Sequence, residues 1–138
     1  MPKKFEFVKD LTSDVMFRAY GKNQKELFEN AALALFTVIC QVKKVKPIEH
    51  VEVIVEGKVE KDLLYNWLQA LIAEVDVRQM FFSRFEVVDI SAKKVSAILY
   101  GEEMTKEKGE TVVKAVTNYK FMLEKVKSGY VAQVSLDI

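Results

Sequence analysis

The chain has 138 residues, half of them apolar, with 21 basic and 20 acidic side chains. This length is typical of one domain that buries about two-thirds of its unfolded surface, so we expect a single domain over residues 1–138. A net charge of +1 argues against binding of nucleic acid by overall charge, which usually needs a strongly basic face. A local basic patch is compatible with this net charge. The single cysteine, Cys40, excludes an intrachain disulfide and a multi-cysteine metal site.

The sequence also lacks membrane and export signals. Its longest apolar stretch, from Ala31 to Cys40, is shorter than the ~18 residues that a membrane span needs. The segment after Met1 has no apolar run of the kind found in a signal peptide. We therefore expect a cytoplasmic protein that does not contact membranes, with Cys40 buried and unreactive in a helix.

The first half of the chain is predicted to mix strands with helices. Alternating residues predict strands at 5–8 and 15–21, separated by an acidic turn, and a third strand at 51–56. Asn23 followed by Glu26 has the spacing of a helix N-cap and its acidic partner, so a helix is expected from there to about Val42. A second helix is predicted over Lys61–Val75, where apolar residues recur at helical spacing.

From Phe81 onward the apolar pattern has a period of two. It predicts five strands, at residues 82–90, 94–100, 111–117, 120–126 and 130–136. The short turns between them require antiparallel pairing. The predicted fold class is α+β, with two helices packed on a mainly antiparallel sheet in one compact domain.

Residues suited to catalysis are scarce. The one histidine, His50, lies in a polar stretch before a strand, where an exposed bystander is the expected role. All five glycines are placed at predicted turns, so no glycine-rich phosphate loop is present. The sequence gives no positive indication of an enzyme.

Carboxylates remain as candidate functional groups. Asp10 and Asp14 occupy the turn near the start, and Asp137 is adjacent to the α-carboxylate of Ile138. If the last strand is held in a sheet beside that turn, Asp14, Asp137 and Ile138 would form an oxygen-only site suited to calcium or magnesium. The simpler interpretation is that the turn aspartates cap local N–H groups and that Asp137 is solvated near a free end.

Lys114 is a further candidate because it lies in the predicted strand 111–117. It would be either the outward residue of a half-buried sheet or a positive charge near the acidic site, available to a phosphate or to a carboxylate of a partner. The cluster of Lys43, Lys44 and Lys46 is most simply the solvated end of the first helix.

Several segments resemble the archease family, in the right order along the chain. They are Thr12-Ser13-Asp14-Val15, Arg18-Ala19-Tyr20-Gly21-Lys22, the helix segment from Glu26 to Phe36, Phe82-Ser83-Arg84-Phe85, Lys114-Ala115-Val116-Thr117 and the closing Leu136-Asp137-Ile138. Each match alone is weak, whereas together they cover essentially the whole chain.

The resemblance implies a non-catalytic accessory protein of the RtcB-type tRNA-splicing ligase. Such a protein promotes the GTP-dependent guanylylation of the ligase and its multiple turnover, and meets tRNA only indirectly, through the ligase. It also implies a site for calcium or another divalent cation, with Asp14, Asp137 and Ile138 as the ligands that carry over. Lys114 falls within the matching lysine motif and would contact the ligase.

Two positions depart from the family pattern. Leu11 stands where the family often has histidine before the threonine of its first motif, and Asn118-Tyr119 replaces an aromatic-histidine pair after Thr117. Neither change removes a proposed metal ligand, but without histidine a proton-transfer role is not expected at those positions. Two other functions stay open: a general chaperone or modulator of nucleic-acid-modifying enzymes without a metal-centred role, and a stand-alone hydrolase with a carboxylate-bound metal.

Overall fold

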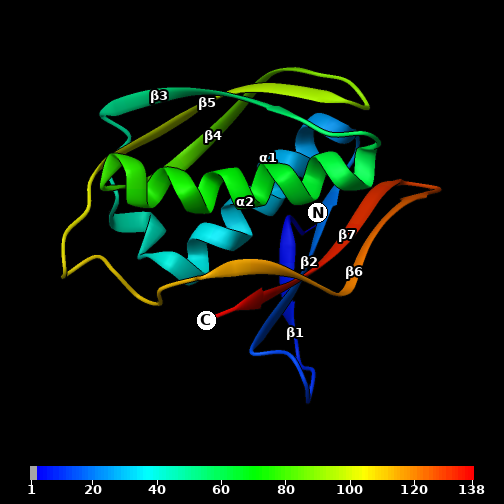
Figure 1. Cartoon of the computed structure of the whole chain (residues 1–138), viewed down its shortest axis with the longest axis horizontal. Helices are drawn as coiled ribbons and strands as arrows, with labels where there is room; N and C mark the ends of the chain where they lie inside the picture. The colour runs from blue at the N-terminus through cyan, green and yellow to red at the C-terminus, as the bar shows by residue number, and fades with distance from the viewer. Residues whose placement is uncertain (1–2) are drawn as a thin grey trace.

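The structure is a computed structural model that describes residues 3–138 (Figure 1). The elements in chain order are β1 (Phe5–Val8), β2 (Val15–Gly21), α1 (Gln24–Ile39), the 3₁₀ helix η1 (Val42–Lys44), β3 (Glu49–Glu56), α2 (Glu60–Arg78), β4 (Met80–Ile90), β5 (Lys94–Glu103), β6 (Ala115–Val126) and β7 (Gly129–Asp137). No helix within residues 3–138 is both long and apolar enough to cross a membrane.

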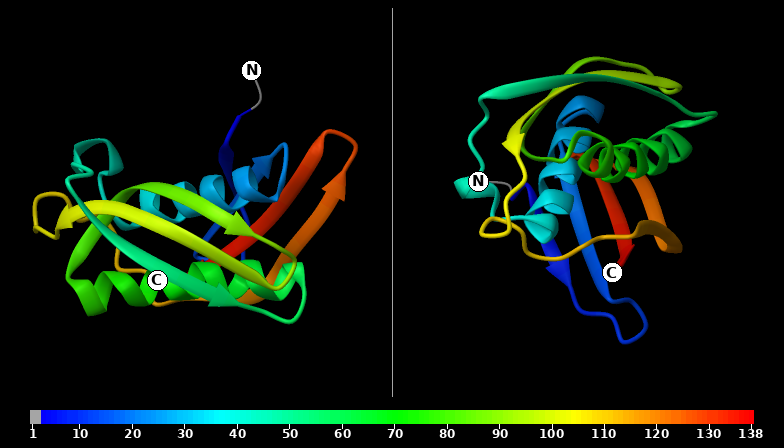
Figure 2. Two further views of the ribbon diagram at one scale, coloured as in Figure 1. Left: turned by 90° about the horizontal axis from the view of Figure 1, so that it is seen from above. Right: turned by 60° about the vertical axis from the view of Figure 1, so that its left-hand side comes forward.

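The elements form three layers. A three-stranded sheet in the order β3-β5-β4 lies on one side of the helices, and a four-stranded sheet in the order β1-β2-β7-β6 lies on the other (Figures 1 and 2). All strand pairs within these sheets are antiparallel. The predicted α+β class is confirmed, with the difference that the strands divide into two sheets and the helices lie between them.

The position of α1 between two sheets explains its composition. Apolar residues face both layers, so its buried residues surround the helix instead of forming one stripe: Leu27, Phe28, Ala31, Ala32, Ala34, Leu35, Phe36 and Ile39. The small alanines let neighbouring elements approach closely. The predicted N-cap is confirmed, since Asn23 Oδ1 accepts the N–H of Glu26 at 2.9 Å, while the Glu26 carboxylate accepts the N–H of Lys22 at 3.2 Å.

The two helices are joined at the centre of the core. Trp67 of α2 is fully buried, and its indole Nε1 donates to the carbonyl of Phe28 in α1 at 3.0 Å. The rings of Phe28 and Trp67 pack with their centroids 6.1 Å apart. α2 is longer than predicted and ends at Arg78, because the next residue, Gln79, has a left-handed φ of 55° and caps the helix.

Two predicted boundaries are wrong. α1 ends at Ile39 and not near Val42, because Cys40 is extended and forms a bridge with Gly109. Cys40 is buried as predicted, and burial raises the pKa of its thiol to about 12, which makes it unreactive at neutral pH.

The predicted strands 111–117 and 120–126 are instead one strand, β6, which begins at Ala115. Residues 111–114 approach the sheet without joining it as a strand. The register of β6 with β7 shifts between Thr117 and Met122, and Lys120 within this bulge has a φ of 52°. A bulge adds residues on one strand only, which is why the sequence pattern was interrupted there.

Candidate functional site

The two acidic segments found in the sequence lie together at one end of the four-stranded sheet. β2 pairs with β7 so that Val15 is opposite Leu136, which places Asp14 and Asp137 beside each other at the end of this pairing. The N–H of Ile138 points to Asp14 Oδ2 at 3.4 Å. The structure therefore brings together the first acidic turn and the last residues, as a shared cation site requires.

Asp14 and Asp137 are exposed, and neither forms an ion pair within residues 3–138. Asp14 immediately precedes Val15, the first residue of β2, and Asp137 follows Leu136, the partner of Val15, so the two aspartates flank the last residue pair of these strands. Two exposed carboxylates thus lie at one end of the sheet, and among residues 3–138 the contact recorded for them is the one from the N–H of Ile138 to Asp14.

A pair of serine hydroxyls fixes the turn against β7. The Oγ atoms of Ser13 and Ser135 are 2.5 Å apart, and Ser13 Oγ also donates to the carbonyl of Val15 at 2.9 Å. Ser135 is only 2% exposed, so this contact is shielded from competing water. Because Ser13 precedes Asp14 and Ser135 is two residues before Asp137, the hydroxyl pair joins the two chain segments that carry the aspartates.

Asp10 has a structural role in the same turn. Its Oδ1 accepts the N–H groups of Thr12 and Ser13 at 2.9 and 3.1 Å. Lys120 Nζ donates to its Oδ2 at 2.9 Å, and the Tyr119 hydroxyl donates to its Oδ1 at 3.1 Å. The interpretation of Asp10 as a local N–H cap is confirmed, and these donors leave little of its carboxylate for another ligand.

The Lys120 ammonium, followed by the N–H groups of Thr12 and Ser13, holds the pKa of Asp10 well below its ordinary value. A carboxylate with a depressed pKa stabilises the folded state above its unfolded pKa of about 4, and this stabilisation is lost as the pH falls toward the folded pKa. We expect Asp10→Asn to lower the melting temperature at pH 7, and the difference from the wild type to shrink below about pH 4. Circular dichroism melts across this range check the prediction. Asp89→Asn, at an exposed position of β4, is the control, and an equal loss at every pH would contradict the titration argument.

Lys114 lies at the same end of the sheet. Its N–H donates to the carbonyl of Asp137 at 2.8 Å, and its side chain is exposed. α2 holds the following residues in place, because Tyr65 donates to the carbonyl of Val116 at 2.8 Å and Gln69 accepts its N–H at 3.0 Å. A lysine is thus held next to the acidic pair, on a chain segment anchored from the core.

The donor set at this end consists only of oxygens, which hard cations prefer. Within residues 3–138, no group of three or more histidine, cysteine, aspartate or glutamate side chains has the arrangement of a metal site. Asp14 and Asp137 supply two side chains, so a cation here needs the Ile138 carboxylate and oxygens from water or a partner. The residues fit a hard cation bound at an exposed, incompletely enclosed position.

Three residues of this region were not predicted as parts of the site. Ser135, Tyr119 and Lys120 hold the acidic turn in place. Of these three residues the sequence singles out only Tyr119, because Asn118-Tyr119 departs from the family pattern. Lys120 meets Asp10 because of the β6 bulge, which the apolar pattern does not reveal. Leu11 is fully exposed at the tip of the turn, and His50 is exposed as predicted.

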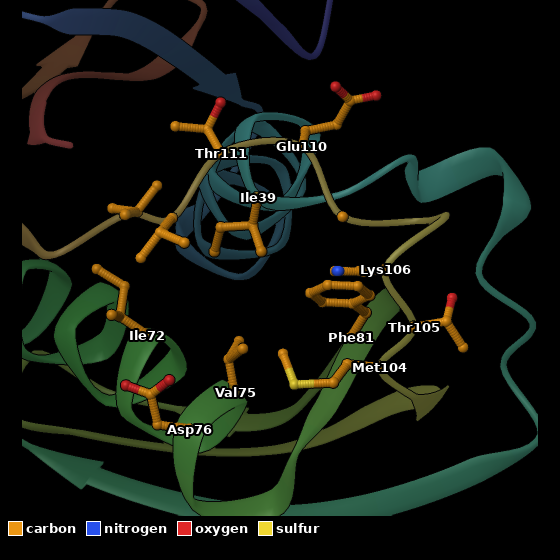
Figure 3. Close-up of a pocket in the computed structure, with 13 residues that line it drawn as sticks. Ile39, Ile72, Val75, Asp76, Phe81, Met104, Thr105, Lys106, Glu110 and Thr111 are labelled. Carbon is orange, nitrogen blue, oxygen red and sulfur yellow. The ribbon is translucent and has the colours of Figure 1, made fainter.

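An apolar hollow of about 480 Å³ opens elsewhere, between the end of α1, α2 and the segment 104–113 (Figure 3). Ile39, Ile72, Val75, Phe81 and Met104 surround it, as the figure shows. None of the predicted site residues lines this hollow.

Comparison with known proteins agrees with the resemblance found in the sequence. Residues 5–138 match the model of the Archease protein family (MTH1598/TM1083). The chain is 38% identical to protein archease of Sulfurisphaera tokodaii over 139 residues, covering 99% of each chain, and 37% identical to that of Methanosarcina mazei over 142 residues, covering 99% and 97%.

Solved structures show the same fold. Protein 1598 of Methanobacterium thermoautotrophicum superposes with a TM-score of 0.83 at 32% identity, over 98% of this chain and 99% of that one. An archease of Thermotoga maritima, described as a possible chaperone, has a TM-score of 0.69 at 17% identity, over 100% and 98%. The family model and the full-length relatives leave one conclusion: this chain belongs to the archease family.

Proposed function

We propose that this protein activates an RtcB-type tRNA-splicing RNA ligase in the cytoplasm. It would promote the GTP-dependent guanylylation of the ligase and its multiple turnover, without catalysing a reaction itself, and would meet tRNA only through the ligase. The observation that carries the proposal is the meeting of Asp14 with Ile138 across the end of the β2–β7 pair, in a chain of the archease family.

Asp14, Asp137 and the Ile138 carboxylate would hold calcium or another divalent cation. When bound, the cation supplies positive charge that orients and neutralises the phosphates of GTP. The carboxylates would present this charge at an exposed tip able to enter the active site of the ligase. The Ser13–Ser135 pair would keep the two aspartates at a fixed spacing, which lowers the cost of organising the site on binding.

Lys114 would contribute to the contact with the ligase. Its main-chain N–H is bonded to the carbonyl of Asp137, and its side chain is exposed and forms no ion pair among residues 3–138. It is therefore available to a phosphate or to an acidic side chain of the partner.

A single-turnover guanylylation assay tests this function. The cognate ligase is mixed with labelled GTP, with and without one equivalent of this protein, in the presence of calcium or of a chelator. We expect the protein to raise the rate of ligase labelling by more than tenfold, equal to more than about 1.4 kcal/mol of barrier, and the chelator to remove the effect. Equal rates with and without the protein would contradict the proposal.

The main alternative is a general chaperone or modulator without a metal-centred role. The apolar hollow beside Phe81 and Met104 is the feature on which such a role would depend, because exposed apolar concavities bind apolar groups. Stimulation that persists in chelator, and extends to unrelated enzymes, would favour this alternative.

A further inference from the structure

The lysines of this nearly neutral chain are distributed unevenly. Four segments meet at the end of the molecule where β7 begins, namely residues 21–26, 57–62, 91–94 and 124–130 (Figure 1). They contain eight lysines and four acidic residues, a net charge of +4, whereas the whole chain carries +1. The rest of the molecule is therefore net negative, and positive charge is concentrated at this end.

Specific contacts hold the four segments together. Gln24 Nε2 donates to the carbonyl of Ser91 at 2.7 Å, and the N–H of Gly57 donates to the carbonyl of Lys93 at 2.9 Å. Gly129, with a φ of 141°, lies so close to the start of α1 that a Cβ there would be 2.2 Å from the carbonyl oxygen of Gly21. The lysines are thus carried on a fixed scaffold.

Two hollows at this end share Tyr130. One has a volume of about 530 Å³ and the other about 450 Å³. Tyr130 lines both, is partly exposed, and lies 5.9 Å from Lys125 Nζ. The lysines that line the two hollows are Lys3, Lys4 and Lys22 in the first, and Lys58, Lys61, Lys93 and Lys125 in the second. Together the hollows form a lysine-lined track with an aromatic ring where they meet.

The charges of these lysines are largely uncompensated. All seven are exposed, and only Lys3 forms an ion pair, with Glu6 at 3.4 Å, among residues 3–138. Glu26, in the first hollow, accepts the N–H of Lys22, and Glu60, in the second, has a buried Oε2. Of the acidic residues that line the hollows, Glu26 is therefore bound to backbone and Glu60 is partly buried, while the lysines are exposed.

We propose that this lysine track binds single-stranded nucleic acid. Proteins that bind single strands combine a positively charged groove along the backbone with an aromatic side chain on which a base stacks. Lysine without arginine suits phosphate contacts, whereas lysine is depleted at protein–protein interfaces. The proposal goes beyond the function proposed above, in which RNA is met only through the ligase.

The track is separate from the acidic end. It lies where β7 begins, and Asp137 is at the other end of this nine-residue strand, about 26 Å away at ~3.3 Å per residue. One molecule would thus contact single-stranded nucleic acid at one end and the ligase at the other. Because binding to the track is measured on the protein alone, its failure and the failure of ligase activation are distinguishable.

Fluorescence anisotropy tests the proposal, with a labelled oligouridylate of about 15 nucleotides as the probe. We expect salt-sensitive binding, strongest near 50 mM salt. Replacing Lys58, Lys93 and Lys125 by glutamine should weaken binding about tenfold or more and reduce the slope of log Kd against log salt by about 2, at ~0.7 per lost contact. The control replaces Lys43, Lys44 and Lys46 by glutamine. It removes the same number of positive charges, at the opposite end of α1 from the track, and should leave binding nearly unchanged.

Two further variants test the aromatic ring. Tyr130→Phe should retain binding, and Tyr130→Leu should weaken it about tenfold through lost stacking. Thermal melts check that every variant is folded. Absence of binding by the wild type at low salt, equal losses in both lysine variants, or equal displacement by polyglutamate would overturn the proposal, the last by indicating an acidic polypeptide as the partner.

Discussion

Asp137→Asn is expected to abolish stimulation of the ligase while leaving the protein folded. The substitution removes one negative charge from the acidic end but keeps the size of the side chain, and Asp137 is exposed with no side-chain hydrogen bond among residues 3–138. Its structural contact is made by its main-chain carbonyl, which accepts the N–H of Lys114 and survives the change. Stimulation in the single-turnover assay should fall by at least tenfold, or about 1.4 kcal/mol.

Two variants sharpen this experiment. Asp89→Asn removes an equal charge from an exposed position on β4 and should stimulate normally. Adding two glycines after Ile138 moves the terminal carboxylate away from Asp14 and should impair stimulation while both aspartates remain. Terbium luminescence, with the lanthanide in place of calcium, reports cation binding without the ligase. An Asp137→Asn protein that stimulates like the wild type would exclude the metal-centred mechanism.

Trp67→Ala is expected to destabilise the folded state severely. Trp67 is fully buried between the helices and donates to the carbonyl of Phe28. Removing it leaves a cavity among rigid neighbours, because two sheets enclose both helices and limit their collapse. We expect a loss of about 3–5 kcal/mol in the free energy of unfolding.

Guanidinium unfolding measures this loss as a lower midpoint with an unchanged slope. Val77→Ala is the matched control, because Val77 is on the same helix and 74% exposed, and should change the free energy by less than about 0.5 kcal/mol. Trp67→Phe, which refills most of the space but loses the indole donor, should fall between the two. A small effect of Trp67→Ala would mean that the helices can repack.

Local signals in the sequence were sufficient for most elements. The Asn23 cap, the alternation at Val51, Val53 and Val55, and the helical stripe containing Trp67 each predicted an element that the structure contains. Such signals depend only on residues close in the chain, so the elements they predict can be recognised without knowledge of the long-range contacts. The division into two sheets was not predicted, because strand partners are chosen by contacts between residues far apart in the chain.

The candidate site shows the same limit more sharply. The sequence and its resemblance to a family pointed to Asp14 and Asp137 as candidate ligands, and the β2–β7 pairing places these two residues together. The residues that support the site could not be predicted from the sequence. Lys120 contacts Asp10 because Lys120 lies in a bulge of β6, where its backbone is left-handed. Ser135 has the pattern of an ordinary strand residue, and only the folded chain brings its hydroxyl against Ser13.

The pairing of β2 with β7 has a consequence for biosynthesis. Ser13 and Ser135 are separated by 122 positions in the chain, so the interior of the four-stranded sheet stays open until β7 has been translated. We expect the hairpin of β4 and β5, whose partners are close in sequence, to assemble earlier on the ribosome, because short loops close at lower entropic cost. A nascent chain that stalls before β7 would therefore lack Asp137 and Ile138, and with them half of the site proposed above.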